Sequence, residues 1–174
     1  MRIRKAAKAD IQAVSAIFSA IHAAEEQGKL VIGWVREIYP TKETACAALS
    51  RGDLFVLEAD GCIVGSAIIN RIQVPDYARG SWQYTADDDE IMVLHTLCIH
   101  PDAMGKGYGK AFVSFYEGYA VAHGCPCLRM DTNAVNANAR AMYRKLGYRE
   151  AGIVPCVFNG IEGVGLVLLE KYLN

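Results

Sequence analysis

Residues 91–109, IMVLHTLCIHPDAMGKGYG, predict a buried strand that leads through a glycine-rich turn into a helix. The first nine residues are largely apolar at both alternating sets of positions, as in a central strand buried on two faces. Gly105, Gly107 and Gly109 then remove three side chains, which lets the backbone approach a ligand and direct its N–H groups outward. The helix expected from about Lys106 to His123 adds unpaired N–H groups and the positive end of its dipole. The segment therefore predicts a site for an anion such as a polyphosphate.

Two common phosphate-binding motifs do not fit these glycines. A Walker loop requires Lys-Ser or Lys-Thr directly after its last glycine, and this segment has neither. A dinucleotide-binding G-x-G-x-x-G motif requires a glycine where Phe112 stands. It also follows a first strand, whereas this cluster lies beyond the middle of the chain.

The segment closely resembles the acetyl-coenzyme A (acetyl-CoA) loop of the GCN5-related N-acetyltransferases, the GNAT family. That loop reads Q/R-x-x-G-x-G/A, and its positions correspond to Met104, Gly107 and Gly109. A later family motif, N-x-x-A-x-x-x-Y-x-x-x-G-F/Y, is similar to residues 136–148, which contain Asn136, Ala139, Tyr143, Gly147 and Tyr148. The resemblance implies an α/β fold: a mixed, partly splayed β-sheet of six or seven strands, flanked by about four helices, with the cofactor in the split.

Length and composition predict a single domain over residues 1–174, and the resemblance implies that it is an acetyltransferase domain. A chain of 174 residues, 52% of them hydrophobic, can bury about 70% of its extended surface in one core. The formal net charge of −1 argues against a general attraction for nucleic acid or acidic membranes. Because the N-terminus lacks an apolar signal region and no long apolar run follows, we expect a cytoplasmic protein. The six cysteines lack zinc-type spacing and are expected to be small buried hydrophobic residues.

Outside the central segment, the sequence predicts alternating strands and helices. Strands are expected at 2–5, 53–59, 62–70 and 127–131, and helices at about 8–27, 41–52 and 136–146. The pairs Asp60-Gly61 and Asn159-Gly160 are typical of tight hairpin turns. Residues 72–90 form an irregular polar and aromatic stretch, and its length favours a functional role.

The resemblance implies direct transfer of an acetyl group from acetyl-CoA to a primary amine in a ternary complex, without a metal. An alkyl ammonium with a pKa of about 10.4 leaves only about one molecule in two thousand neutral at pH 7, so a base is needed. His95 is the first candidate, because imidazole titrates near neutrality. The segment LHTLCIH also resembles arylalkylamine N-acetyltransferases, in which the matching histidine relays the amine proton. Glu90 is the main alternative, because many family members carry a glutamate near this strand, and His100 is a third candidate.

The leaving thiolate and the cofactor require other groups. Tyr143 matches the family tyrosine that gives its hydroxyl proton to the thiolate. Asn136 can cap its helix or bond the pantetheine arm. The resemblance further implies that the backbone of Leu97, Cys98 and Ile99 lies along that arm. The loop expected to hold the pyrophosphate comprises Met104, Gly105, Lys106, Gly107, Tyr108, Gly109 and Lys110. Met104 lacks the usual Arg or Gln side chain, and the two lysines are candidates to compensate for it.

The acceptor is less defined by sequence. Trp34, Tyr77, Trp82 and Tyr84 are candidates to line its site. The acidic run 87–90 would attract a cationic amine, although such runs are also typical of solvated loops. We expect a small primary amine or amino acid, with no nucleic-acid or membrane partner. A protein or peptide N-acetyltransferase and a non-catalytic acyl-CoA-binding regulator are the alternatives, and the sequence leaves open whether the protein forms a homodimer.

Overall fold

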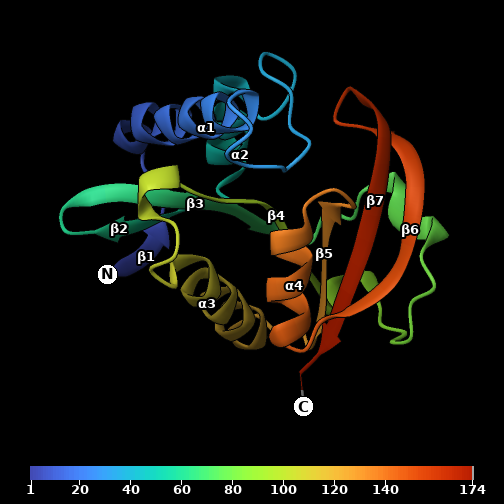
Figure 1. Ribbon diagram of the computed structural model, residues 1–174. Coiled ribbons are helices and arrows are strands. Elements are labelled where there is room, and N and C mark those ends of the chain that lie inside the picture. The colour runs from blue at the N-terminus through green and yellow to red at the C-terminus, as the bar shows by residue number, and fades with distance from the viewer. Residues whose placement is uncertain (174) are drawn as a thin grey trace.

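The computed structural model describes residues 1–173, which form one seven-stranded mixed sheet with four α-helices (Figure 1). The strands lie in the order β1-β2-β3-β4-β5-β7-β6, and only β4 and β5 are parallel neighbours. The strands are β1 (Arg2–Lys5), β2 (Leu54–Ala59), β3 (Cys62–Asn70), β4 (Ile91–Ile99), β5 (Cys127–Asn133), β6 (Arg149–Phe158) and β7 (Ile161–Tyr172). The helices are α1 (Ile11–Glu26), α2 (Lys42–Arg51), α3 (Tyr108–Ala122) and α4 (Ala137–Lys145). The predicted fold class is confirmed.

The helices cover the two faces of the sheet in pairs (Figure 1). Apolar residues of α1 and α2, such as Ile17 and Ala48, pack on one face against Val56 and Ile68. Aromatic residues along one side of α3 pack on the other face, together with Tyr143 of α4. Two of them, Phe112 and Tyr116, are fully buried. The amphipathic pattern of each helix therefore fixes which face of the sheet it covers.

The two turn pairs form the predicted hairpins. Asp60 and Gly61 have positive φ angles of 53° and 78° between β2 and β3, and Asn159 and Gly160 have 50° and 81° between β6 and β7. Such angles match the right-handed twist of the flanking strands. Boundaries differ slightly elsewhere: α3 begins at Tyr108, and residues 8–10 form a short 3₁₀ turn (Lys8–Asp10) before α1.

The sheet opens between β4 and β5. These strands pair only from Ile91↔Cys127 to Leu94↔Met130. Beyond that point β5 continues along β7, while β4 stays with β3 through a bulge at which Thr96 has a φ of 50°. A bulge bends the strand that carries it, so β4 diverges from β5 after four pairs.

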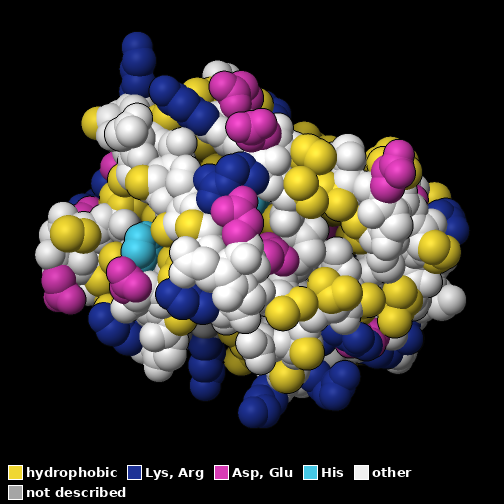
Figure 2. Space-filling model, turned by 45° about the horizontal axis from the view of Figure 1, so that its top comes forward, with side chains coloured by type: hydrophobic (Ala, Val, Ile, Leu, Met, Phe, Trp, Pro, Cys, Tyr) yellow, Lys and Arg dark blue, Asp and Glu magenta, His cyan; other side chains and the backbone are white. Residues whose placement is uncertain are grey.

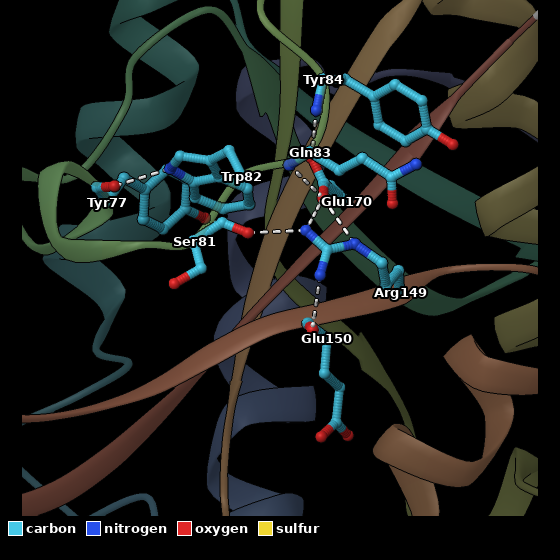
Figure 3. Close-up of polar contacts among 8 residues, drawn as sticks. All are labelled: Tyr77, Ser81, Trp82, Gln83, Tyr84, Arg149, Glu150 and Glu170. Atoms are coloured by element: carbon cyan, nitrogen blue, oxygen red, sulfur yellow. Dashed lines mark hydrogen bonds and ion pairs between the residues drawn. The ribbon is translucent and has the colours of Figure 1, made fainter.

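Residues 72–90 cover the far half of the sheet on the face of α1 and α2. The fully buried Glu170 of β7 accepts hydrogen bonds from the N–H groups of Gln83 (2.8 Å) and Tyr84 (3.3 Å) and from Arg149 Nε (2.8 Å) (Figure 3). Arg149 also donates to the Ser81 carbonyl (2.6 Å). These contacts attach the segment firmly to β6 and β7.

Three of the six cysteines depart from the expected burial. Cys98, Cys125 and Cys127 are buried as expected, but Cys46 and Cys62 are exposed and Cys156 is half-buried. The expectation was wrong for Cys46 because α2 turns Ala45 and Ala48 to the core instead. It was wrong for Cys62 because that residue directly follows a turn.

Basic and acidic side chains are interspersed over the face drawn in Figure 2, in keeping with the small net charge. Among residues 1–173, no helix is long and apolar enough to cross a membrane. The same residues contain no cluster of three or more His, Cys, Asp or Glu side chains that could hold a metal ion.

Candidate functional site

A cavity of about 740 Å³ lies where β4 and β5 diverge. Its walls come from the end of β4, the turn before α3, one side of α4, the end of β5 and residues 30–34. The predicted site residues that line it are His95, Tyr143, Trp34, Leu97, Cys98, Ile99, Met104, Gly105, Gly107, Tyr108, Gly109, Lys110 and Asn136. One space therefore brings together two of the four candidate catalytic residues, His95 and Tyr143, and most of the candidate cofactor residues.

Six predicted site residues lie outside this lining. One is His100, whose Nδ1 accepts the N–H of Asp102 (3.2 Å). Lys106 and Glu90 are exposed, and the Glu90 carboxylate accepts the N–H of Asp87 (3.3 Å) within its own short turn. Trp82 packs beneath the Arg129 guanidinium, 4.2 Å from the ring centre, and donates to the Tyr77 carbonyl (2.7 Å). Tyr84 stacks on Tyr172. Of the aromatic residues in 72–90 that we expected at the acceptor site, only Tyr77 reaches it, through a hydrogen bond described below.

The turn before α3 presents unpaired N–H groups at one end of the cavity. Gly105 and Gly107 have φ angles of 78° and 81°, which favour glycine. The first α-helical bond of α3 runs from the Ala111 N–H to the Gly107 carbonyl (2.9 Å), so the amides before it have no acceptor within the helix. With Lys110 beside them in the lining, these amides make this end of the cavity suited to an anion.

The open edge of β4 forms the middle of the cavity. Residues 96–99 have left β5, so their outer backbone groups face the cavity and not another strand. The Cys98 side chain points into the layer formed by α1 and α2, where its sulfur lies 3.1 Å from the Ser66 hydroxyl. Burial raises the pKa of the Cys98 thiol to about 11. This thiol therefore stays protonated at neutral pH and is a poor nucleophile.

His95 is held in one tautomer by a chain of side chains. The Asn70 amide donates through Nδ2 to Asp53 (2.8 Å), and its Oδ1 accepts the Ile72 N–H (2.8 Å), which fixes the amide orientation. His95 Nε2, 3.1 Å from Asn70 Oδ1, is therefore assigned as a donor, and Nδ1 carries the lone pair. Burial lowers the pKa of His95 to about 4, against smaller opposing effects of Ile72 and Asp53. The imidazole is thus neutral at pH 7.

Tyr143 and Asn136 approach from α4. Only 6% of Tyr143 is exposed, and its pKa is raised far above the usual value, first by burial and then by the negative charge of Asp131. Its hydroxyl therefore remains a proton donor across the physiological range. Asn136 Oδ1 accepts the Ala139 N–H (3.1 Å), so the expected helix cap is confirmed.

Asp131 is a site residue that the sequence did not reveal. It lies on β5, lines the cavity, and accepts a hydrogen bond from the Tyr77 hydroxyl at Oδ2 (2.8 Å). Burial raises the pKa of this carboxyl to about 6. The available signal was alternation in CLRMDTN, which places a carboxylate on the same side of a predicted strand as Cys127.

Residues 30–34 form one wall of the cavity. The Glu25 carboxylate, in the last turn of α1, accepts N–H groups from Ile32 (2.8 Å), Gly33 and Trp34 (3.2 Å). Charged hydrogen bonds of this kind are stronger than neutral ones. They hold Trp34 at the cavity wall.

Several known proteins are similar to this chain in sequence. The family model described as "Acetyltransferase (GNAT) family" matches residues 18–148. An acetyltransferase of Yersinia enterocolitica is 34% identical over 93 residues, which cover 53% of this chain and 55% of that protein. One of Pectobacterium atrosepticum is 34% identical over 109 residues, covering 62% and 64%. The chain thus spans just over half the length of these curated relatives.

Solved structures agree over nearly the whole chain. A GNAT-family acetyltransferase of Streptococcus agalactiae has a TM-score of 0.80 at 22% identity, covering 99% of this chain and 95% of that one. An acetyltransferase of Salmonella typhimurium, solved with its cofactor acetyl-CoA, has a TM-score of 0.68 at 20% identity, covering 100% and 94%. At such identities the likeness establishes the fold, and the family match adds sequence evidence over most of the chain. The chain belongs to the acetyltransferase (GNAT) family.

Proposed function

We propose that the protein is an N-acetyltransferase that transfers the acetyl group of acetyl-CoA to a small primary amine, directly and in a ternary complex. The observation that carries this proposal is the single cavity that joins an anion-binding turn to a neutral histidine and a protonated tyrosine. Family membership supports the same reaction class.

The residues present fit acetyl-CoA. The unpaired amides between Gly105 and Lys110 would hold its diphosphate. The open edge of β4 from Thr96 to Ile99 would bond the pantetheine arm as an added strand does. When bound, the cofactor supplies an activated acetyl thioester. Met104, which is 39% exposed at this end, offers no charge, so Lys110 is the cation left to assist.

Proton transfers at the two ends of the reaction follow from His95 and Tyr143. His95 accepts a proton at Nδ1 as the amine nitrogen bonds the acetyl carbon. Tyr143 donates its hydroxyl proton to the sulfur as the carbon–sulfur bond breaks. Solvent returns the proton from His95 to Tyr143, which restores both groups. The protonated, inward-facing Cys98 argues against an acyl-enzyme route.

Thiol release from acetyl-CoA with a panel of small amines and short peptides tests this proposal. We expect turnover with small amines, and we expect His95→Gln and Tyr143→Phe to lower kcat about 10²- to 10⁴-fold, as losses of positioned proton transfer do. Tyr119→Phe is the matched control, because Tyr119 lies on α3, is only partly buried and does not line the cavity. It should leave kcat unchanged. Preference for peptides would favour the protein acetyltransferase, and binding of acetyl-CoA without any turnover would favour the regulator.

A further inference from the structure

We propose that Asp131 binds the ammonium group of the acceptor beside His95, and that the acceptor is a cationic primary amine with an apolar body. This inference rests on the proposed function, because it concerns the acceptor half of the same cavity. It assigns a role to a half-buried carboxylate that neither family motif contains.

The register of the sheet places Asp131 at the reaction centre. Leu94↔Met130 is the last pair before β4 and β5 part, so His95 and Asp131 are the first residues of the two diverging strands. Val93 and Cys127 share one apolar cluster, and strand alternation puts His95 and Asp131 on that same side. Both line the cavity.

One oxygen of the Asp131 carboxylate is hydrogen-bonded and the other is not, within residues 1–173. Oδ2 accepts the Tyr77 hydroxyl (2.8 Å), while Oδ1 has no hydrogen-bond partner among residues 1–173. Asp131 also pairs with Leu168 of β7, which fixes its backbone. No basic side chain within the described chain forms an ion pair with it. Asp131 is half-buried, and desolvation raises its pKa to about 6. A desolvated carboxylate without a cation normally binds one or takes up a proton.

The surrounding wall indicates what the rest of the acceptor must be. Around Asp131 the cavity is lined largely by apolar side chains from the 72–90 segment and the β6–β7 hairpin: Ile72, Val74, Phe158, Ile161 and Leu166. An ammonium group at Asp131 would therefore be followed by an aliphatic or aromatic body. A free carboxylate on the acceptor would find only Arg51 as a lining arginine, and Arg51 is already paired with Asp53 (2.8 Å).

Several ionisable groups surround Asp131 and shape its pH dependence. They are Asp76 and Tyr77 of the η2 turn (Pro75–Arg79), Tyr39 of the loop before α2, His95 of β4, Tyr143 of α4 and Cys156 of β6. His95, with a pKa of about 4, and Tyr39, with a pKa of about 12, keep their charge between pH 5 and pH 8. Asp131, with a pKa of about 6, changes its charge within that range.

Calorimetric titration tests this with wild type, Asp131→Asn and the control Asp60→Asn, which makes the same change at an exposed carboxyl of the β2–β3 turn. The probes are butylamine, hexylamine and benzylamine, each against the alcohol with the same carbon skeleton, with CoA present so that no turnover occurs. At pH 8 we expect Asp131→Asn to weaken amine binding about 10- to 100-fold, as loss of a charged hydrogen bond does, and to leave alcohol binding unchanged. At pH 5 the wild type should lose the same advantage.

A second variant keeps the test independent of the first. Tyr77→Phe removes a donor to the carboxylate, so the midpoint of the pH dependence of amine binding should move upward. Equal amine affinity in wild type and Asp131→Asn, parallel loss for amines and alcohols, or an effect of Asp60→Asn instead would overturn the proposal. If CoA binds but no amine does, Asp131 is misassigned while the cofactor site stands. If CoA itself does not bind, the proposed function fails first.

Discussion

At the scale of single residues, burial acts in opposite directions on two neighbouring groups. It lowers the pKa of His95 to about 4 and raises that of Asp131 to about 6, since in each case the charged form loses its water. The imidazole is consequently neutral at pH 7, with a lone pair on Nδ1. The Asp131 carboxyl is mostly ionised at pH 7, and its negative charge has no cation beside it among the described residues. Such a group is expected to bind an ammonium group.

The same physics predicts that Asp131→Asn stabilises the protein at neutral pH. Because the folded pKa of Asp131 is raised, its contribution to stability is full below the unfolded value and is lost as the pH rises through about 6. A shift of about two units corresponds to about 3 kcal/mol. Urea unfolding should show Asp131→Asn more stable by about 2–3 kcal/mol at pH 8 and nearly equal to wild type at pH 4.

Asp89→Asn should show no such pH-dependent gain, since Asp89 is exposed. A constant difference between Asp131→Asn and wild type from pH 4 to pH 8 would mean that Asp131 carries no cost of burial.

Motifs located some site residues and could not locate others. His95 interrupts an apolar strand and Tyr143 completes a spaced pattern, so both are visible in the chain itself, and both line the cavity. Asp131 becomes notable only through Tyr77, which is 54 residues away. No local pattern encodes that hydrogen bond.

At the scale of elements, the glycine turn supports a prediction about backbone conformation. Gly107→Ala should weaken acetyl-CoA binding about tenfold, because an alanine at a φ of 81° costs about 1–2 kcal/mol and re-aims the amides. A Cβ there would meet no atom within 4 Å, so the effect is conformational.

Gly118→Ala is the matched control within the same helix. Gly118 is exposed in α3 and its added Cβ also meets nothing within 4 Å, so this substitution should stabilise the protein by about 1 kcal/mol. Cofactor titration and thermal unfolding of both variants provide the measurements. Equal cofactor affinity in the two variants would contradict the role given to the turn.

The loop at 30–34 supports a prediction about the acceptor side. Glu25→Ala removes the acceptor of three backbone N–H groups and should raise the KM for the amine about tenfold, while the Kd for acetyl-CoA stays unchanged. Glu26→Ala, next to it but exposed and paired with Arg36, should change neither constant. A parallel loss of cofactor binding in Glu25→Ala would show that the loop supports the whole fold and not the acceptor site alone.

Long-range contacts also explain why sequence patterns could not place the individual residues of 72–90. Length and aromatic content favour a functional loop, yet Gln83 and Tyr84 bond to Glu170, 87 and 86 residues further along the chain. Periodicity predicts the regular elements because their patterns are local. It cannot predict which buried carboxylate attaches an irregular segment.

At the scale of the whole molecule, the order and pairing of the strands create the cavity. One parallel pair inside an otherwise antiparallel sheet stops after four residue pairs, and the bulge at Thr96 turns β4 away. The family resemblance implied this split, and the early end of the β4–β5 pairing confirms it. The cavity unites residues from 21 to 166 along the chain, so its full lining requires the folded structure.

The most direct test of the whole account is the crystal structure of the complex with CoA and hexylamine. We predict the diphosphate against the amides of Gly105 to Lys110, the pantetheine arm along Thr96 to Ile99, and the amine nitrogen within hydrogen-bond distance of Asp131 Oδ1. Density for CoA at another surface, or an amine bound away from the split between β4 and β5, would contradict it.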